Sequence, residues 1–138
     1  MELLARELIQ RYVDGWKENN VGKITKPLAK DCIIIESHGS TYRGIEQVKQ
    51  WVDFWIKDNG KVIRWEITSF YFVKKERVAL FEWDFACTAG GKNHALFGIS
   101  IVRFTKNKIT FIHEYRMTKN PYNWDVSELK LGFLVFES

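Results

Sequence analysis

The chain has little cysteine and no long apolar run, and each shortage excludes a class of protein. No apolar segment approaches the roughly 20 residues that a membrane-spanning helix needs, and residues 1–6 are not typical of a secretory signal. The two cysteines, Cys32 and Cys87, both fall within strand-like runs. We therefore expect buried free thiols rather than a disulfide, and a cytoplasmic protein.

Motifs of several familiar chemistries are also missing. The chain has no phosphate-binding loop, no nucleophile elbow and no Cys-His signature. Its three histidines, His38, His94 and His113, lie on different expected elements without the spacing of metal ligands, so we predict no metal site and no cofactor. The net charge of +4 comes from scattered lysines and arginines with acids among them, which favours a solvated surface over a nucleic-acid-binding face. We expect neither nucleic acid nor a membrane as a partner.

Aromatic side chains are abundant, with six tryptophans and ten phenylalanines. Such an excess is typical of a thick core, an aromatic-lined cavity or an adhesive interface. The length of 138 residues predicts one domain with room for a real core, and the chain shows no internal repeat or interdomain linker.

The spacing of apolar residues changes along the chain from a helical to a strand period. Residues 2–19 and 44–57 each carry a one-sided helical stripe. Between them we expect a short helix over 21–29, interrupted near Pro27, and a small hairpin whose first strand is 32–36. Four long strands follow, separated by turn signals, and each should pair antiparallel with its neighbour in sequence: 62–73, 78–88, 94–105 and 109–118.

This order predicts an α+β fold in which a twisted sheet curls around the helices and leaves a cavity at one end. The run 95–102 is apolar on both faces, and the helices can cover only one of them. We therefore expect a homodimer formed through the other face of the sheet. The interface residues that we expect are Phe97, Ile99, Ile101, Phe111 and Tyr115. The apolar tail, 119–138, should pack on its own domain or on the partner, and the sequence does not choose between these.

A tyrosine and a glutamate stand where proteins rarely bury polar groups. Tyr12 lies on the apolar stripe of the first helix, and Glu36 ends the very apolar strand 32–36. If helix and strand pack together, both groups can share a dry cavity suited to proton chemistry on an apolar small molecule. The alternatives stay open: Tyr12 can be a core tyrosine, and Glu36 a solvated strand end paired with a lysine. His38 shares a strand face with Glu36, or lies in water in a turn.

The order of elements resembles the nuclear transport factor 2-like (NTF2-like) superfamily, especially its SnoaL-like and ketosteroid-isomerase-like branches, over residues 2–118. The segments that carry the resemblance are 10–13, the strand ending at Glu36 with Gly39-Ser40 after it, Tyr42-Arg43-Gly44, 97–104 and 108–115. The resemblance implies a cone-shaped α+β roll, with a SnoaL-like domain over 1–118 and a C-terminal extension over 119–138.

The resemblance to ketosteroid isomerases also implies roles for three residues. Tyr12 matches the tyrosine proton donor, and Glu36 matches the carboxylate base, with Glu in place of the usual Asp. Ser100 falls at the position of the protonated aspartic acid of the oxyanion hole and is a much weaker donor. Losing one such donor typically costs about 100- to 1000-fold in rate, so the resemblance does not imply steroid isomerisation as such.

The expected walls of the cavity are mostly aromatic. By the resemblance, Phe81, Trp83 and Phe85 face inward from one strand, although plain core packing would explain them equally well. We expect Trp51 and Trp55 to close the cavity from above, with Trp16 deeper inside.

The last strand can be oriented in two ways. Hydrophobicity places Phe111, His113, Tyr115 and Met117 inside, whereas the resemblance places Ile112, Glu114 and Arg116 inside. We follow the resemblance, because a dimer would bury the aromatic face equally well. Glu114 and Arg116 should then form a charged pair inside the cavity.

Two functions remain open. In the first, the chain binds an apolar or aromatic small molecule and acts as a cofactor-independent isomerase, cyclase or dehydratase, with Glu36 as general base and with Tyr12 and Ser100 stabilising an oxyanion. In the second, it is a non-catalytic dimeric binding or association module whose cavity is filled by side chains.

Overall fold

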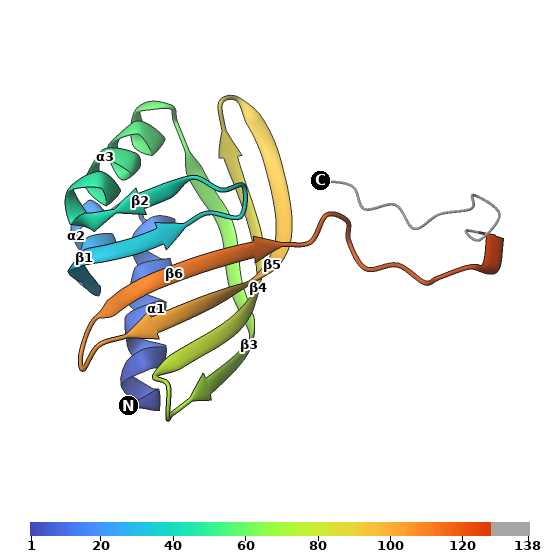
Figure 1. Cartoon of the computed structure of the whole chain (residues 1–138). Coiled ribbons are helices and arrows are strands. Elements are labelled where there is room, and N and C mark those ends of the chain that lie inside the picture. The colour runs from blue at the N-terminus through green and yellow to red at the C-terminus, as the bar shows by residue number, and fades with distance from the viewer. Residues whose placement is uncertain (128–138) are drawn as a thin grey trace.

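The computed structural model describes residues 1–127 and contains three helices and six strands in that range. The chain order, seen in Figure 1, is α1 (Glu2–Lys17), α2 (Val21–Thr25), β1 (Leu28–Ile35), β2 (Thr41–Arg43), α3 (Gly44–Lys57), β3 (Lys61–Val73), β4 (Val78–Ala89), β5 (Lys92–Phe104) and β6 (Ile109–Arg116). The α+β class and the expected succession of elements are therefore confirmed.

All six strands form one sheet, in the order β2-β1-β6-β5-β4-β3. The long strands β3 to β6 pair antiparallel with their neighbours in sequence, as predicted. Of the two remaining pairings, β1 with β2 is antiparallel, and β1 with β6 is parallel and pairs Ile34 with Ile112 and Ile35 with His113. The residues that follow these pairs, Glu36 and Glu114, are therefore neighbours at the same end of two adjacent strands.

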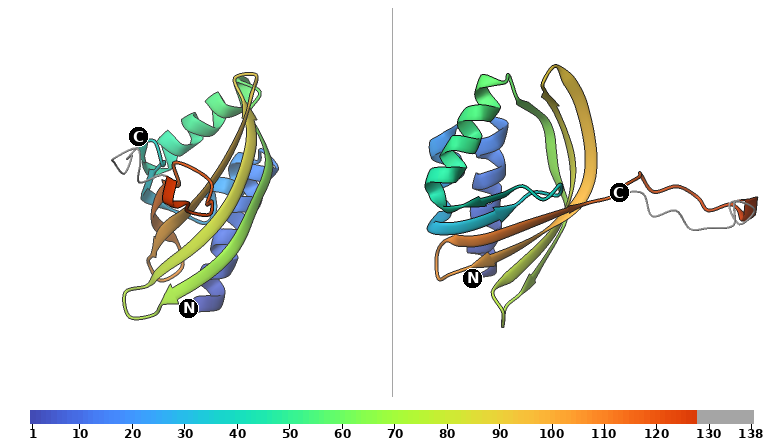
Figure 2. Two further views of the ribbon diagram at one scale, coloured as in Figure 1. Left: turned by 90° about the vertical axis from the view of Figure 1, so that its right-hand side faces the viewer. Right: turned by 45° about the horizontal axis from the view of Figure 1, so that its top comes forward.

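The sheet curves around helix α1, so that the helices lie on its concave side and the other side faces outward (Figures 1 and 2). Helix α3 and the hairpin joining β4 to β5 stand on opposite sides of the wide end of this cone. The twist of long antiparallel strands produces such curvature without closing the sheet into a barrel.

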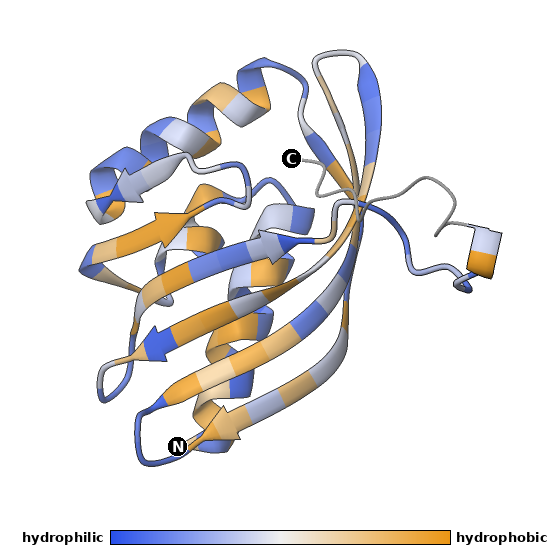
Figure 3. Ribbon diagram, turned by 45° about the vertical axis from the view of Figure 1, so that its right-hand side comes forward, coloured by the Kyte–Doolittle hydropathy of each residue, from blue (hydrophilic) through white to orange (hydrophobic). Residues whose placement is uncertain are grey.

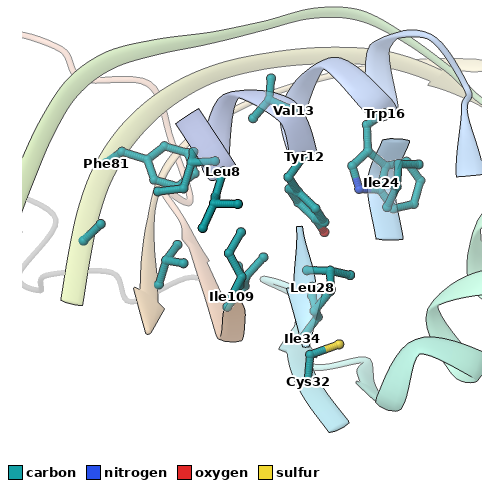
Figure 4. Packing of buried hydrophobic residues seen from close by; sticks show 14 of the residues in the cluster. Leu8, Tyr12, Val13, Trp16, Ile24, Leu28, Cys32, Ile34, Phe81 and Ile109 are labelled. Carbon is teal, nitrogen blue, oxygen red and sulfur yellow. The ribbon is translucent and has the colours of Figure 1, made fainter. Parts of the chain in front are cut away.

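The core lies between α1 and the concave face of the sheet. Helix α1 buries Leu8, Ile9 and Val13, members of the predicted stripe. Leu8 lies beside Phe81 and Ile109, as Figure 4 shows, and all three are nearly inaccessible to solvent. Full burial of such side chains typically stabilises the fold by about 1.5–3 kcal/mol each, so this end of the cone carries much of the stability.

Element boundaries differ most from the prediction around Pro27. Helix α2 ends at Thr25 instead of continuing toward residue 29, and β1 already begins at Leu28. Proline lacks an N–H group for the helix ladder, but its carbonyl oxygen accepts a hydrogen bond from the Ile109 N–H at 2.8 Å. Pro27 thus ends the helix and starts the pairing of β1 with β6.

The outer face of the sheet carries the five residues expected at a dimer interface. Cross-strand pairing of Ile99 with Tyr115 places these two on one face, and Phe97 and Ile101 follow by the two-residue period. Most of this group is half-buried, but Tyr115 is 45% exposed. Figure 3 shows long hydrophobic stretches (orange) along the central strands.

Both cysteines are free and buried, as predicted. None of the helices among residues 1–127 is long and apolar enough to cross a membrane. Residues 117–127 run away from the sheet (Figure 1), and the greater part of the apolar tail, 128–138, lies outside the described residues.

Gly98 gives a test of the packing between β5 and the cavity wall. A Cβ atom at this position would collide with the carbonyl oxygen of Tyr115 and the indole of Trp83. We expect Gly98→Ala to lower the free energy of unfolding by about 1–3 kcal/mol, measured by urea denaturation. The matched control is Gly22→Ala in helix α2, where the added methyl group meets only Asn20 Oδ1 at 3.5 Å and should be neutral or stabilising. Equal stabilities of the two variants would contradict this packing.

Candidate active site

A cavity of about 360 Å³ opens at the wide end of the cone. Nine of the residues that we expected at the site lie on its wall: Trp16, Glu36, His38, Trp51, Trp55, Trp83, Phe85, Glu114 and Arg116. The register of β6 is thus the one that the resemblance implies, with Glu114 and Arg116 facing inward and the Phe111 side facing outward.

Aromatic rings form a continuous chain around the cavity. The Tyr42 ring stacks on Trp51 at 4.0 Å between centroids, and Trp51 lies 4.5 Å from Trp16. The chain continues on the sheet side, where Trp65 meets Phe85 edge-to-face at 5.4 Å. Edge-to-face and offset contacts of this kind each contribute about 0.5–1.5 kcal/mol beyond the area that they bury. They hold the rings as a fixed wall.

Trp55 is anchored by groups from two loops. Its indole N–H donates to Asn19 Oδ1 at 3.1 Å, and the Asn19 amide donates to the Gly60 carbonyl oxygen at 3.0 Å. Asn19 has φ +51°, a left-handed conformation that Asn tolerates better than most residues. A Cβ atom at Gly60 would overlap the Trp55 ring. The two loops therefore fix the orientation of this indole.

Glu36 lies at the end of β1 and is held by a tyrosine that we had not singled out. The Tyr42 hydroxyl donates to Glu36 Oε1 at 2.6 Å, and His38 Nε2 lies 3.5 Å from the same oxygen. Burial first, and then the hydrogen bond to Glu36, raise the pKa of Tyr42, so this phenol stays a donor at neutral pH. The Glu36 side chain is 22% exposed and therefore remains accessible from the cavity.

Glu114 is the more deeply enclosed of the two carboxyl groups. It follows His113 on β6 and pairs across the strands with Ser100. Desolvation, and to a smaller extent the charge of Glu36, raise the pKa of Glu114 to about 8. The sequence had directed attention to Glu36 as a candidate buried acid; both side chains are half-buried in the structure, and it is Glu114 whose pKa is raised.

The expected ion pair between Glu114 and Arg116 does not form. Among the described residues, the salt bridges include no pair that contains either side chain. Arg116 is the last residue of β6 and is exposed to solvent at the rim, where water competes for its charge. Glu114 points into the cavity instead.

Tyr12 and Ser100 lie behind the wall and not on it. The Tyr12 ring is buried against Trp16 and Trp65, at centroid distances of 6.4 and 6.1 Å, and its hydroxyl points between α1 and β1 (Figure 4). Burial, followed by the charges of Glu114 and Glu36, raises the pKa of Tyr12. The Ser100 hydroxyl accepts a hydrogen bond from the Trp83 indole at 2.9 Å. Tryptophan rings thus separate both hydroxyls from the cavity.

Two further residues that we expected on the wall belong to the core. Phe81 and Ile112 are each 2% exposed and pack within the central hydrophobic cluster. Both face inward, but they lie nearer the narrow end of the cone than the cavity does. The two-residue period therefore gave the correct face of each strand without showing how far along it the cavity extends.

Six wall residues were not anticipated: Ser37, Val62, Trp65, Cys87, His94 and Leu96. Cys87 could have been found, because it continues the inward series of Trp83 and Phe85 at the same spacing. Trp65 could not, because the pairing of β3 with β4 shifts register between Val62 and Arg64. This irregularity lets Val62 and Trp65, three residues apart, face the same side.

Metal ligands do not gather in this part of the molecule: residues 1–127 contain no group of three His, Cys, Asp or Glu side chains arranged to hold an ion. The chemistry that the site itself offers is proton transfer between two carboxyl groups and a ligand held against aromatic rings.

Many solved structures share this architecture. An LEH-like epoxide hydrolase from M. tuberculosis superposes with a TM-score of 0.73 at 12% sequence identity, over 83% of this chain and 84% of that one. A protein with a ketosteroid isomerase-like fold from Catenulispora acidiphila, in complex with trimethylamine, gives 0.67 at 20% identity, over 79% and 84%. A protein assigned as a polyketide cyclase from Pseudomonas putida gives 0.69 at 15% identity, over 81% and 90%. At these identities the likeness shows the fold alone.

An α+β cone with a cavity at its wide end defines the NTF2-like class of proteins. The family model of the SnoaL-like domain matches residues 9–112, about three quarters of the chain, so this chain belongs to the SnoaL-like family. The match includes Glu36 and ends two residues before Glu114. No functionally curated protein matches the sequence.

The environment of Glu114 predicts how stability depends on pH. Its folded pKa of about 8 lies above the ordinary 4.5, so between these values the folded state holds a proton that the unfolded state has lost. The folded protein should therefore lose stability as pH rises through this window, by up to about 1.4 kcal/mol per pH unit. The free energy of unfolding, measured by urea denaturation between pH 4.5 and 9, should lose this pH dependence in Glu114→Gln. As pH rises, this variant should therefore become more stable relative to the wild type.

The matched control for this prediction is Glu66→Gln, which neutralises an exposed carboxylate on β3 and should leave the pH dependence unchanged. Parallel pH profiles for the wild type and Glu114→Gln would show that Glu114 is solvated in the folded protein.

Proposed function

We propose that this SnoaL-like protein binds a small, largely apolar or aromatic molecule and transfers protons to and from it without a cofactor. The observation that carries the proposal is the pair of unlike carboxyl groups, Glu36 and Glu114, in one aromatic-walled cavity. Carboxyl groups whose surroundings separate their proton affinities are suited to act as acid and base in one reaction.

The two carboxyl groups take different roles in this proposal. Glu36, accessible and hydrogen-bonded by Tyr42, is the general base that removes a proton from the ligand. Glu114, protonated at neutral pH, is the acid that donates a proton to the ligand where negative charge would otherwise develop. Glu114 thereby replaces Ser100 and Tyr12 in the role that the resemblance gave them, and those two residues support the wall from behind.

Removal of a proton at one position and donation at another amounts to isomerisation. The same pair of steps supports cyclisation, or a dehydration in which the acid protonates a departing hydroxyl. We therefore propose a cofactor-independent isomerase or lyase. The cavity of about 360 Å³ falls within the range of small-molecule sites, which favours this function over an association module with a filled interior.

The proposed base can be tested with a generic carbon acid. The ring of 5-nitrobenzisoxazole, a flat aromatic molecule, opens when a base removes its carbon-bound proton. The wild type should accelerate this opening, measured by absorbance of the phenolate product, and Glu36→Gln should reduce the enzymatic rate by roughly 100-fold or more. Glu66→Gln on β3 is the control for loss of one carboxylate. A rate that is unchanged in Glu36→Gln would rule out Glu36 as the base.

For the assembly we propose a homodimer through the outer face of the sheet. The helices cover the opposite face (Figures 1 and 2), and the outer face presents Phe97, Ile99, Ile101, Phe111 and Tyr115. A second copy offers the same apolar surface and can bury it symmetrically. The buried free thiols suit a reducing compartment such as the cytoplasm.

Light scattering coupled to size-exclusion chromatography tests the dimer. We expect twice the chain mass of 16.3 kDa for the wild type and the monomer mass for Ile99→Asp, because burying an unpaired carboxylate is costly. Phe54→Asp, at a side chain 75% exposed on α3, should remain dimeric. A monomeric wild type, or a dimeric Ile99→Asp, would contradict the proposed interface.

A further inference from the structure

The cavity wall offers electron-rich ring faces but few hydrogen-bond donors. The indole N–H groups of Trp55 and Trp83 already donate to other side chains of the protein. The indole nitrogens of Trp16 and Trp65 are buried out of reach of solvent, and that of Trp16 interacts with the Tyr12 hydroxyl. Four of the five tryptophans on the wall, all but Trp51, therefore present ring carbon to a ligand and direct no N–H group at it.

Hydroxyl donors are equally scarce at the inner end. Tyr12 and Ser100 lie behind the wall, and the Ser100 hydroxyl is engaged by Trp83. The Tyr42 hydroxyl donates to Glu36. The exposed residues Arg116, His38 and His94 could stabilise negative charge at the cavity wall, but the buried hydroxyls described here offer a ligand little besides the proton of Glu114.

Positive charge, in contrast, would be stabilised from several sides. The faces of aromatic rings attract cations within about 6 Å, tryptophan most strongly, and more so where water is excluded. Glu36 and Glu114 add two carboxyl groups whose mutual repulsion already disfavours ionisation of Glu114. A cation between them would relieve that repulsion and favour the charged form of both.

The positively charged groups of the protein do not already neutralise Glu36 and Glu114. His38 approaches Glu36 at 3.5 Å with a side chain that is 56% exposed, so it lies at the mouth. Arg116 lies at the rim and makes no salt bridge with either carboxylate, as described above. Both carboxyl groups therefore remain available to a ligand.

Building on the proposed function, we infer that the ligand becomes an organic cation in the cavity: an amine, imine or nitrogen heterocycle, attached to an apolar body, whose nitrogen takes up the proton of Glu114. Its nitrogen lies between the two carboxylates and the indole faces, and its apolar part lies against Trp65 and Phe85. A neutral amine can take its proton from the Glu114 carboxyl, which leaves an ammonium–carboxylate pair in the cavity.

Binding of such a cation is coupled to the ionisation of Glu114. A quaternary ammonium ion, which can accept no proton, binds best to the carboxylate form, so its affinity should rise with pH up to about 8 and then level off. The titratable and charged groups around Glu114 that could contribute are Glu36, Tyr12, Tyr42, His38, Cys87, His94 and Arg116.

The test compares benzyltrimethylammonium with neopentylbenzene, its neutral isostere in which carbon replaces nitrogen. Binding is followed by quenching of tryptophan fluorescence at pH 8. We expect the cation to bind roughly ten-fold more tightly than the isostere, once their different solubilities in water are taken into account by measured partition coefficients. The cation's affinity should fall as pH is lowered from 8 to 6, while that of the isostere stays constant.

Variants separate this inference from the proposed function. Glu114→Gln should abolish the preference for the cation over the isostere and the pH dependence of cation binding. It should still bind the isostere. Glu66→Gln, the control, should keep both the preference and its pH dependence. Equal binding of both probes by the wild type would overturn the cation inference and leave the apolar pocket standing. Binding of neither probe would overturn both. A cation preference that survives in Glu114→Gln and in Glu36→Gln would show that the carboxylates do not recognise the ligand.

Discussion

The parallel pairing of β1 with β6 is the constraint on which the site depends. These strands lie at opposite ends of the domain's sequence, and only their pairing places Ile35 beside His113. Because both strands run in the same direction, the residues that follow, Glu36 and Glu114, emerge at the same end of the sheet, the end where the cone is wide. An antiparallel pairing would send them to opposite ends.

Once the two carboxyl groups are neighbours, the surroundings decide their protonation. Removing two negative charges from water into one cavity walled by indoles costs much free energy, because the charges also repel each other. Glu36 keeps contact with the Tyr42 hydroxyl and with the cavity mouth. Glu114 is enclosed, and its raised pKa follows from burial first and from Glu36 second. The asymmetry between an acid and a base thus follows from position in the sheet, although the residue types are identical.

The sequence correctly predicts the helices and strands and which of their side chains face the interior, because both depend on the local spacing of apolar residues. The stripe of α1 and the inward series Trp83, Phe85 of β4 are examples. The sequence does not show which inward-facing side chains reach the cavity and which are packed in the core. Phe81 and Trp83 belong to one period, yet Phe81 lies wholly within the core cluster and only Trp83 reaches the cavity. The raised pKa of Glu114 likewise depends in part on the charge of Glu36, which follows a different strand.

Backbone irregularities set a second limit on prediction. The register shift in β3 after Val62 changes which side chains face inward, so strict alternation misses Trp65. Tyr12 shows a third limit. Its stripe position is correctly predicted, but the rings against which it packs come from Trp16 on the same helix and Trp65 on a distant strand. Whether a buried polar group reaches a cavity is a property of its neighbours and not of its own position.

The cavity itself also needs a physical explanation, because large aromatic side chains ordinarily collapse into a packed core. Here glycines determine where the indoles go. Gly98 leaves the space that Trp83 occupies against β5, and Gly60 leaves the space for Trp55, whose N–H is tied to Asn19. Each ring is thus held against backbone at the edge of the cone and cannot move inward without losing that contact. The volume that remains is bounded by rigid walls, and at its inner end an enclosed carboxyl group makes complete apolar filling costly.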